Sequence, residues 1–264
     1  MNTPMNTKHE QSTTTQSQVS VSRRSRKSTI TRADWLIPAG LILLTSIPAL
    51  GGVVSLVGFA TSTALTPDDT KFHDLPLPIV LHIVSALPFC LLGAFQFAPG
   101  LRRRWRGFHR LAGWLVVLCG LTTGLSGLWM TQFYLFSLQS QSMLLYSFRM
   151  LFGSAMVLAL ALGLVAILRR NLARHRAWMI RGYAIGQGAG TQALTALLWM
   201  IIFGTLGEPA KDWLHGVSWV INLAVAEWLI HRKHAKGRQK QVDTGHDQSR
   251  ALLSGKSPST SAGV

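Results

Sequence analysis

The sequence predicts an all-α membrane protein, a bundle of six transmembrane helices with a four-helix core formed by spans two to five. The main observation is that four long segments carry no charged residue, namely 35–60, 83–100, 111–131 and 150–168. Apolar runs of about 18 residues or more are typical of membrane-spanning helices, because roughly 20 residues cross the hydrocarbon core. A soluble helix of this length would need a polar face, and these segments have none. A second observation is that all twenty-six Lys and Arg residues lie outside these segments, mostly on one side of the predicted bundle.

The expected spans follow one another along the chain with short connections. The first begins too late and is too long for a cleaved signal peptide, so it should remain as a span. The third and fifth each follow an arginine-rich segment, and the fourth and fifth each contain one arginine. No span shows a clear break at mid-membrane, although the first two spans contain the interior prolines Pro38, Pro48 and Pro88. The spans are 35–60, 77–98, 111–130, 143–168, 177–203 and 213–230.

Two polar tails flank the membrane domain, which covers residues 34–231. Residues 1–33 are rich in Ser, Thr, Gln and Asn, and residues 232–264 are polar and basic. Both contain too few apolar residues to form a core, so we expect both to be disordered. The Ser/Thr-rich N-terminal tail also has the composition of an organelle transit peptide, which is a less favoured interpretation.

The positive charge of the chain predicts its orientation in the membrane. The formal net charge is +16, a value that would also suit a nucleic-acid-binding protein. However, both tails and two arginine-rich loops fall on one side of the predicted bundle, and together they hold twenty-two of the twenty-six Lys and Arg residues. The positive-inside rule therefore places both termini in the cytoplasm, most simply of a bacterial inner membrane. We expect the lipid bilayer, and not nucleic acid, as the partner of these charges.

Two copies of one motif, Arg-Arg-x4-His-Arg, precede spans three and five and end at Arg110 and Arg176. The motif places His109 and His175 at equal depth near the cytoplasmic border. Helical geometry puts each histidine on one face with a stripe of three or four glycines. Such a stripe either allows close helix packing or leaves a slot for a flat ligand beside the histidine, and the two interpretations are compatible.

Two further histidines lie near the opposite border, His82 in span two and His215 in span six. A histidine within a span is costly unless it has a hydrogen-bond partner, a metal or water, and is therefore a candidate for function. For these residues and for the inner pair, two interpretations stay open: the histidine makes an ordinary hydrogen bond within the protein, or it is a ligand of a metal.

Two arginines lie within spans and need acceptors. Arg149 lies about two turns into span four from the outer side, where a carboxylate, a haem propionate, a lipid phosphate or water could accept its hydrogen bonds. Arg181 lies near the cytoplasmic border of span five. It either pairs with Glu227 of span six or, with Arg110 and Arg176, holds the propionates of a bound haem.

The two motif copies also predict a parallel internal repeat, because aligning them places spans two and three on spans four and five. In this alignment His109 matches His175, and the two histidines face each other across the four-helix core. His82 matches Phe148, so a second symmetric pair of histidines is missing.

Four strings of the sequence resemble the domain of unknown function 2306 family of predicted membrane proteins. They are HRLAGWL (109–115), FRMLFGSAM (148–156), HRAWMIRGYAIGQGAGTQ (175–192) and WVINLAVAEW (219–228). The resemblance covers roughly residues 35–230 and implies a six- or seven-span topology with no established activity. A looser resemblance, in arrangement only, is to b-type cytochromes with two haems in a four-helix core.

The leading hypothesis is a transmembrane electron carrier that binds haem b. His109 and His175 would be the axial ligands near the cytoplasmic face, and His82, with His215, would form an outer site. Two histidine ligands leave no open position on the iron, which suits electron transfer to or from a quinone or another redox partner. Any enzymatic activity would then be that of a membrane oxidoreductase. The alternatives are a transporter or binding protein for a small molecule or lipid, and a structural membrane protein without a cofactor.

Overall fold

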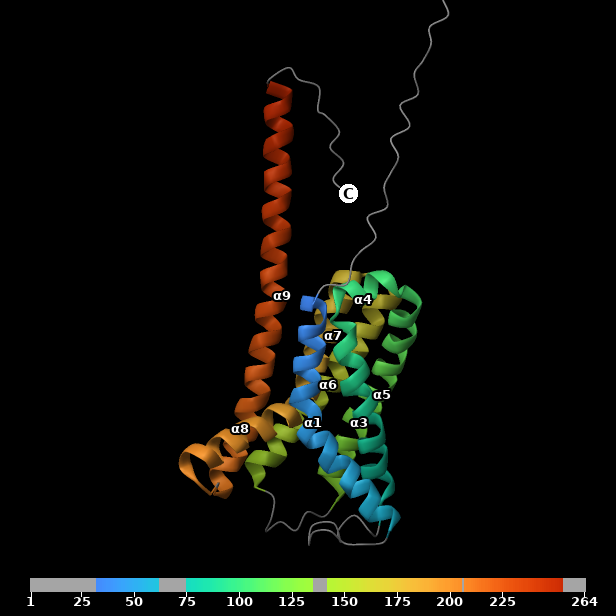
Figure 1. Cartoon of the computed structure of the whole chain (residues 1–264), viewed down its shortest axis with the longest axis vertical. Coiled ribbons are helices and arrows are strands. Elements are labelled where there is room, and N and C mark those ends of the chain that lie inside the picture. Colours follow the sequence, from blue (N-terminus) through green and yellow to red (C-terminus); the bar gives the residue numbers. More distant parts are fainter. Residues whose placement is uncertain (1–31, 62–74, 135–141, 206, 254–264) are drawn as a thin grey trace, which may run out of the picture.

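The computed structural model describes residues 32–61, 75–134, 142–205 and 207–253, and these residues form helices joined by short turns. The predicted N-terminal tail lies outside the described residues except for its last two. Figure 1 shows the helices side by side in one bundle, with α9 projecting beyond it. The helices are α1 (Arg32–Ala60), α3 (Leu77–Gln96), α4 (Pro99–Arg104), α5 (Arg106–Phe133), α6 (Met143–Leu168), α7 (Leu172–Gly186), α8 (Gly188–Phe203) and α9 (Glu208–Leu253).

The prediction of an all-α membrane bundle is confirmed. Five described helices are long and apolar enough to cross a membrane, and the α7–α8 pair makes a sixth span if its two parts are counted together. Large apolar side chains such as Leu43, Leu118 and Ile201 are exposed on the outside of the bundle. In water this surface would be unfavourable, whereas in a bilayer it contacts lipid.

The centre of the bundle is made by α3, α5, α6 and α7. Helix α3 packs along α5, α5 packs on α6, and α6 packs on α7, with α1 and α9 outside this group. The buried side chains at the centre include Phe89, Val116, Leu160 and Tyr183. The arginine-rich end of the bundle carries α4 and the start of α7, and the opposite end carries the turn between α8 and α9 (Figure 1).

The span that contains α7 and α8 is bent by 43° where these helices meet at Gln187 and Gly188. This corrects the expectation that no span is broken. The bend is stabilised by Asn222 of α9, whose side-chain Nδ2 donates to the carbonyl oxygen of Ala184 over 3.1 Å. Its Oδ1 accepts a hydrogen bond of 2.8 Å from the Thr191 hydroxyl. A polar side chain from a neighbouring helix thus supplies hydrogen bonds on both sides of the bend.

We expect the substitution Asn222→Ala to destabilise the bundle by about 1–3 kcal/mol, because it leaves a buried carbonyl and a buried hydroxyl without their partner. The measurement is the thermal unfolding midpoint of the purified protein in detergent. Thr122→Ala is the matched control, since the Thr122 hydroxyl bonds only the carbonyl of Leu118 in its own helix. Equal midpoints for the two variants would show that the Asn222 contacts do not hold the bend.

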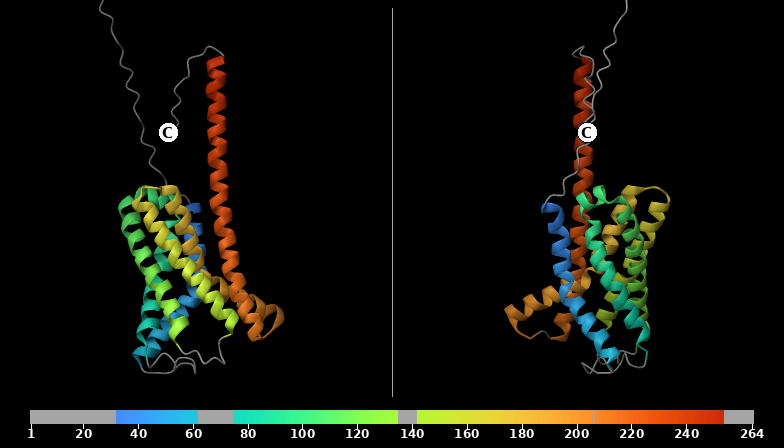
Figure 2. Two further views of the ribbon diagram at one scale, coloured as in Figure 1. Left: turned by 180° about the vertical axis from the view of Figure 1, so that it is seen from behind. Right: turned by 45° about the vertical axis from the view of Figure 1, so that its right-hand side comes forward.

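Helix α9 continues far past the membrane segment, which reaches Arg232, and ends at Leu253. This corrects the expectation of a disordered tail from residue 232. Seven of the nine residues that follow the span, KHAKGRQKQ (233–241), are Lys, Arg, Gln or Ala, which have high helix propensity and can prolong a helix that is already formed. Figure 2 shows the extension standing clear of the bundle at the arginine-rich end.

Candidate functional site

A cavity of about 460 Å³ lies in the half of the bundle away from the arginine-rich end. Its wall is formed by α1, α3, α5, α6 and α9 together with both sides of the α7–α8 bend, and most of its lining side chains are apolar. The polar groups in the wall belong to a few side chains, mainly Thr45, His82, Thr123, Thr131, Arg149, Gln192 and His215. A largely apolar pocket with a few polar groups, in the range of about 300–1,000 Å³, is typical of small-molecule and cofactor sites.

His82 is held in the cavity wall by a polar seam between α3 and α5. Its Nδ1 lies 3.2 Å from the Ser126 hydroxyl oxygen. One turn further along, the hydroxyl groups of Ser85 and Thr123 are 2.8 Å apart. The Ser126 hydroxyl donates its own proton to the backbone carbonyl of Thr122, so its oxygen can accept a hydrogen bond from the Nδ1–H of His82. In this arrangement Nε2 of His82 carries the lone pair.

His215 of α9 is held in the same way, by a hydrogen bond at Nδ1. Its Nδ1 donates to the backbone carbonyl of Lys211 over 2.6 Å, again leaving Nε2 with the lone pair. Its own carbonyl accepts a hydrogen bond of 3.4 Å from Nε2 of Gln192 in α8. The structure therefore brings both predicted outer histidines to the wall of one cavity.

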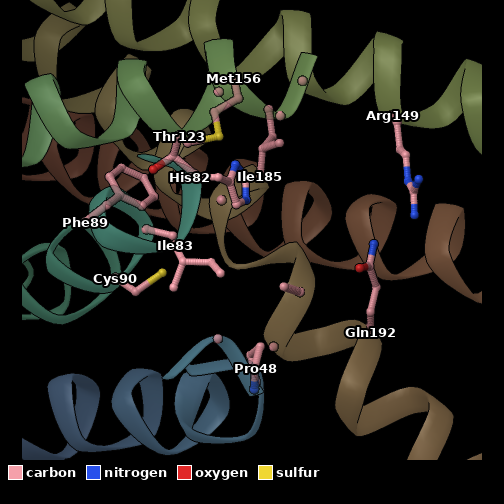
Figure 3. A pocket seen from close by; sticks show the side chains of 18 of the residues that line it. Pro48, His82, Ile83, Phe89, Cys90, Thr123, Arg149, Met156, Ile185 and Gln192 are labelled. Atoms are coloured by element: carbon pink, nitrogen blue, oxygen red, sulfur yellow. The ribbon is translucent and has the colours of Figure 1, made fainter. Parts of the chain in front are cut away.

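Arg149 lines the same cavity, and Figure 3 shows its side chain and that of Gln192 extending toward each other. The carboxylate of Asp212 lies close enough to attract the guanidinium of Arg149. Asp212 is only 5% exposed and accepts a short hydrogen bond from the Ser142 hydroxyl. The permanent charge of Arg149 thus has a carboxylate nearby.

The inner histidines, His109 and His175, lie at the arginine-rich end on α5 and α7. They are close enough to interact electrostatically, and Arg102 of α4 acts on His109 as well. Nδ1 of His175 is 2.8 Å from the carbonyl oxygen of Gly163, so this ring also keeps Nε2 for another contact.

The glycine stripes below the inner histidines are filled by neighbouring side chains. A Cβ atom at Gly120 would lie 2.6 Å from the Phe89 ring, and one at Gly182 would lie 2.8 Å from Leu160. These glycines therefore serve close helix packing, and the slot that the sequence also suggested is occupied by protein. Gly113, one turn from His109, is not closely packed, because a Cβ atom there would lie 3.8 Å from its nearest neighbour, Gln96 Oε1.

The remaining predicted site residues have separate roles. Arg181 forms a two-pronged ion pair with Glu227, at 2.5 and 2.9 Å, and stacks over the Trp178 ring at 4.8 Å. This is the simpler of the two predicted interpretations, and it leaves Arg181 unsuited to a propionate. Arg110 is exposed, whereas Arg176 is partly buried.

One residue near the cavity, Asp212, was not predicted, although a signal for it exists in the sequence. Asp212 is an acidic residue next to the start of a span, and it lies near Arg149 although 63 positions separate them. Carboxylates are scarce in this chain, so an in-span arginine on the same side of the membrane could have pointed to it. In the described part of the chain, no three His, Cys, Asp or Glu side chains gather closely enough to bind a metal ion.

The described structure is that of a multi-pass helical membrane protein with a cavity between its spans. Residues 79–230 match the family described as predicted membrane protein, DUF2306, and the chain belongs to this family. No curated protein and no solved structure matches the chain.

Proposed function

We propose that the protein is a transmembrane electron carrier that binds haem b in the cavity between His82 and His215. The observation that supports this proposal is the position and hydrogen bonding of the two imidazole rings. Both line one cavity, and each has its Nδ1 engaged by a protein acceptor and its Nε2 left as a potential ligand. Metal-binding histidines are commonly oriented in this way by a hydrogen bond at the other ring nitrogen.

The rest of the cavity suits this ligand. Its apolar wall matches a porphyrin, and Arg149 offers the charge-assisted hydrogen bonds that a propionate accepts. A haem held there by His82 and His215 would supply one-electron transfer rather than oxygen chemistry. A quinone or a redox protein would be the partner in this exchange.

The inner pair, His109 and His175, supports the same chemistry less well. The two rings are near each other, but the glycines below them are filled by side chains such as Phe89 and Leu160. The proposal therefore moves the haem from the inner pair, which the sequence favoured, to the outer pair.

The test is the reduced-minus-oxidised absorption spectrum of protein purified from haem-replete cells. We expect sharp b-type bands that His82→Ala and His215→Ala each abolish, and that His231→Ala, at an exposed histidine outside the cavity, leaves unchanged. Loss of the bands in His175→Ala alone would place the haem at the inner pair, and a spectrum without such bands would exclude haem from the protein.

A second candidate is a transporter or binding protein for a small amphipathic molecule or lipid. The bend between α7 and α8 favours it, because broken helices beside a cavity are typical of transporters. Residues on both sides of this bend, including Ile185 of α7 and Gly190 of α8, line the cavity. In this case the purified protein would be colourless and would bind a dansyl-labelled fatty acid saturably, with Arg149→Met weakening the binding.

A further inference from the structure

The cavity changes from polar to apolar with depth along its walls. On α3, His82 lies toward the end of the bundle away from the arginine-rich end, and Phe89 lies about two helical turns deeper. On α6, Arg149 and Met156 follow one another in the same sense and at the same spacing. Figure 3 shows Arg149 and Gln192 on one side of the cavity and Phe89 on the other. The cavity therefore has a polar end and an apolar end.

The polar end is suited to a negatively charged group. The guanidinium of Arg149 and the side-chain amide of Gln192 present N–H donors there. Among the described residues that line the cavity, none is Asp or Glu, and Asp212, which lies near Arg149, is not part of the wall. Arginine binds a carboxylate through two parallel hydrogen bonds, so a carboxylate is a suitable group for this end.

Phe89 of α3 lies at the apolar end and is only 1% exposed. Its ring fills the space between α5 and α7. A Cβ atom at Gly120 of α5 would lie 2.6 Å from this ring, and one at Gly186 of α7 would lie 2.3 Å from it. Both distances are too short for a side chain, so the ring fits because these two positions are glycines. Phe89 therefore closes the path from the cavity into the arginine-rich half of the bundle.

Two further aromatic side chains support Phe89 from behind. The ring centroid of Tyr183 lies 5.4 Å from that of Phe89, and the centroid of Phe97 lies 4.9 Å from that of Tyr183. The Tyr183 hydroxyl donates to the backbone carbonyl of Cys90 over 2.7 Å, which fixes the middle ring of the three. Neither Tyr183 nor Phe97 lines the cavity, so Phe89 is the ring of this stack that a bound molecule would meet.

We propose that the cavity binds a carboxylate with a single apolar chain, such as a fatty acid, and that Phe89 limits the length of this chain. The carboxylate lies at Arg149 and the chain runs toward Phe89. A cavity of about 460 Å³ has the size of a site for one small molecule. This inference rests on the second function proposed above, a transporter or binding protein for an amphipathic molecule, and not on haem binding.

The experiment uses the full chain in nanodiscs that contain saturated fatty acids of increasing length at equal mole fractions in the lipid. Native mass spectrometry measures which lengths remain bound to the protein. Chains that fit should be retained about equally. The first chain that is too long should be retained at least about fivefold less, the equivalent of about 1 kcal/mol for forcing methylenes into a filled space. In Phe89→Ala this limit should move to longer chains.

Phe97→Ala is the matched control, because it removes a ring from the same stack without changing the cavity wall. It should leave the length limit where the wild-type protein has it. Fatty alcohols of the same lengths should be retained less than the acids, since they lack the charge that Arg149 attracts. Unfolding midpoints show whether the variants are folded, and Phe89→Leu, a smaller truncation with the same expected direction, replaces Phe89→Ala if that variant is not.

The outcomes separate this inference from the function on which it rests. Retention of no fatty acid of any length would overturn both. Retention without an upper length limit, or with a limit that Phe89→Ala leaves unchanged or that Phe97→Ala moves equally, would overturn the role of Phe89 and leave the binding function in place. Equal retention of acids and alcohols would overturn the assignment of a carboxylate to the end of the cavity at Arg149.

Discussion

The substitution Gly190→Ala is expected to destabilise the bundle by about 2–3 kcal/mol, close to the upper range for overpacking a well-packed position. Gly190 lies in the first turn of α8, where the chain approaches α1. A Cβ atom there would lie 2.5 Å from the backbone oxygen of Leu44 and 3.0 Å from its carbonyl carbon. A backbone group cannot move aside as a side-chain end can, so α1 as a whole would have to shift away from α8.

The measurement for Gly190→Ala is the unfolding midpoint in detergent, followed by haem content or probe binding. Gly113→Ala is the matched control, because its Cβ would meet only Gln96 Oε1 at the ordinary distance of 3.8 Å. We expect the control to unfold like the wild type or slightly later, since alanine favours a helix over glycine by up to about 1 kcal/mol. If both variants unfold at the wild-type midpoint, the close approach of α1 and α8 is not part of the folded protein.

The spans could be predicted from the sequence because their signal is local. A charge-free run of apolar residues has one stable place in a bilayer, so hydropathy alone finds segments such as α3 and α6. The Arg181–Glu227 pair was also foreseeable, since a cation within a span needs an acceptor and few carboxylates exist in this chain. Both inferences need only the depth of a residue, which the sequence supplies.

The bend at Gln187 could not be found in this way, because no proline marks it. Its stability depends on Asn222, which lies 38 positions after Ala184 and contacts it only once α9 has packed. The cavity could not be predicted from the sequence either. Its volume depends on how α1, α6 and α9 are arranged, and no single segment carries that information. The histidines were recognised as candidates from their depth, but the sequence ranked the inner pair first because the motif copies are symmetric. The structure places His82 and His215, which lack that symmetry, in the wall of the same cavity.

Removing the carboxylate of Asp212 is the second change with a large expected effect. Asp212 is buried, is held by the Ser142 hydroxyl, and provides negative charge near Arg149. In Asp212→Leu that charge is lost and the guanidinium of Arg149, in the membrane-spanning part of α6, loses a compensating partner. Leaving a partly buried cation without nearby negative charge is costly, and we expect a loss of up to about 3 kcal/mol because Arg149 also faces the cavity.

The double variant Arg149→Met/Asp212→Leu separates this electrostatic effect from a simple packing defect. Once the cation is also removed, no uncompensated charge remains in the span, so the double variant should unfold at a higher temperature than Asp212→Leu alone. Glu227→Gln is a useful comparison. It breaks the Arg181 pair, whose side chains are 27% and 38% exposed, and should cost about 1 kcal/mol or less. If the double variant is no more stable than Asp212→Leu, the acidic residue stabilises α9 through its hydrogen bond to Ser142, and its attraction to Arg149 contributes little to the fold.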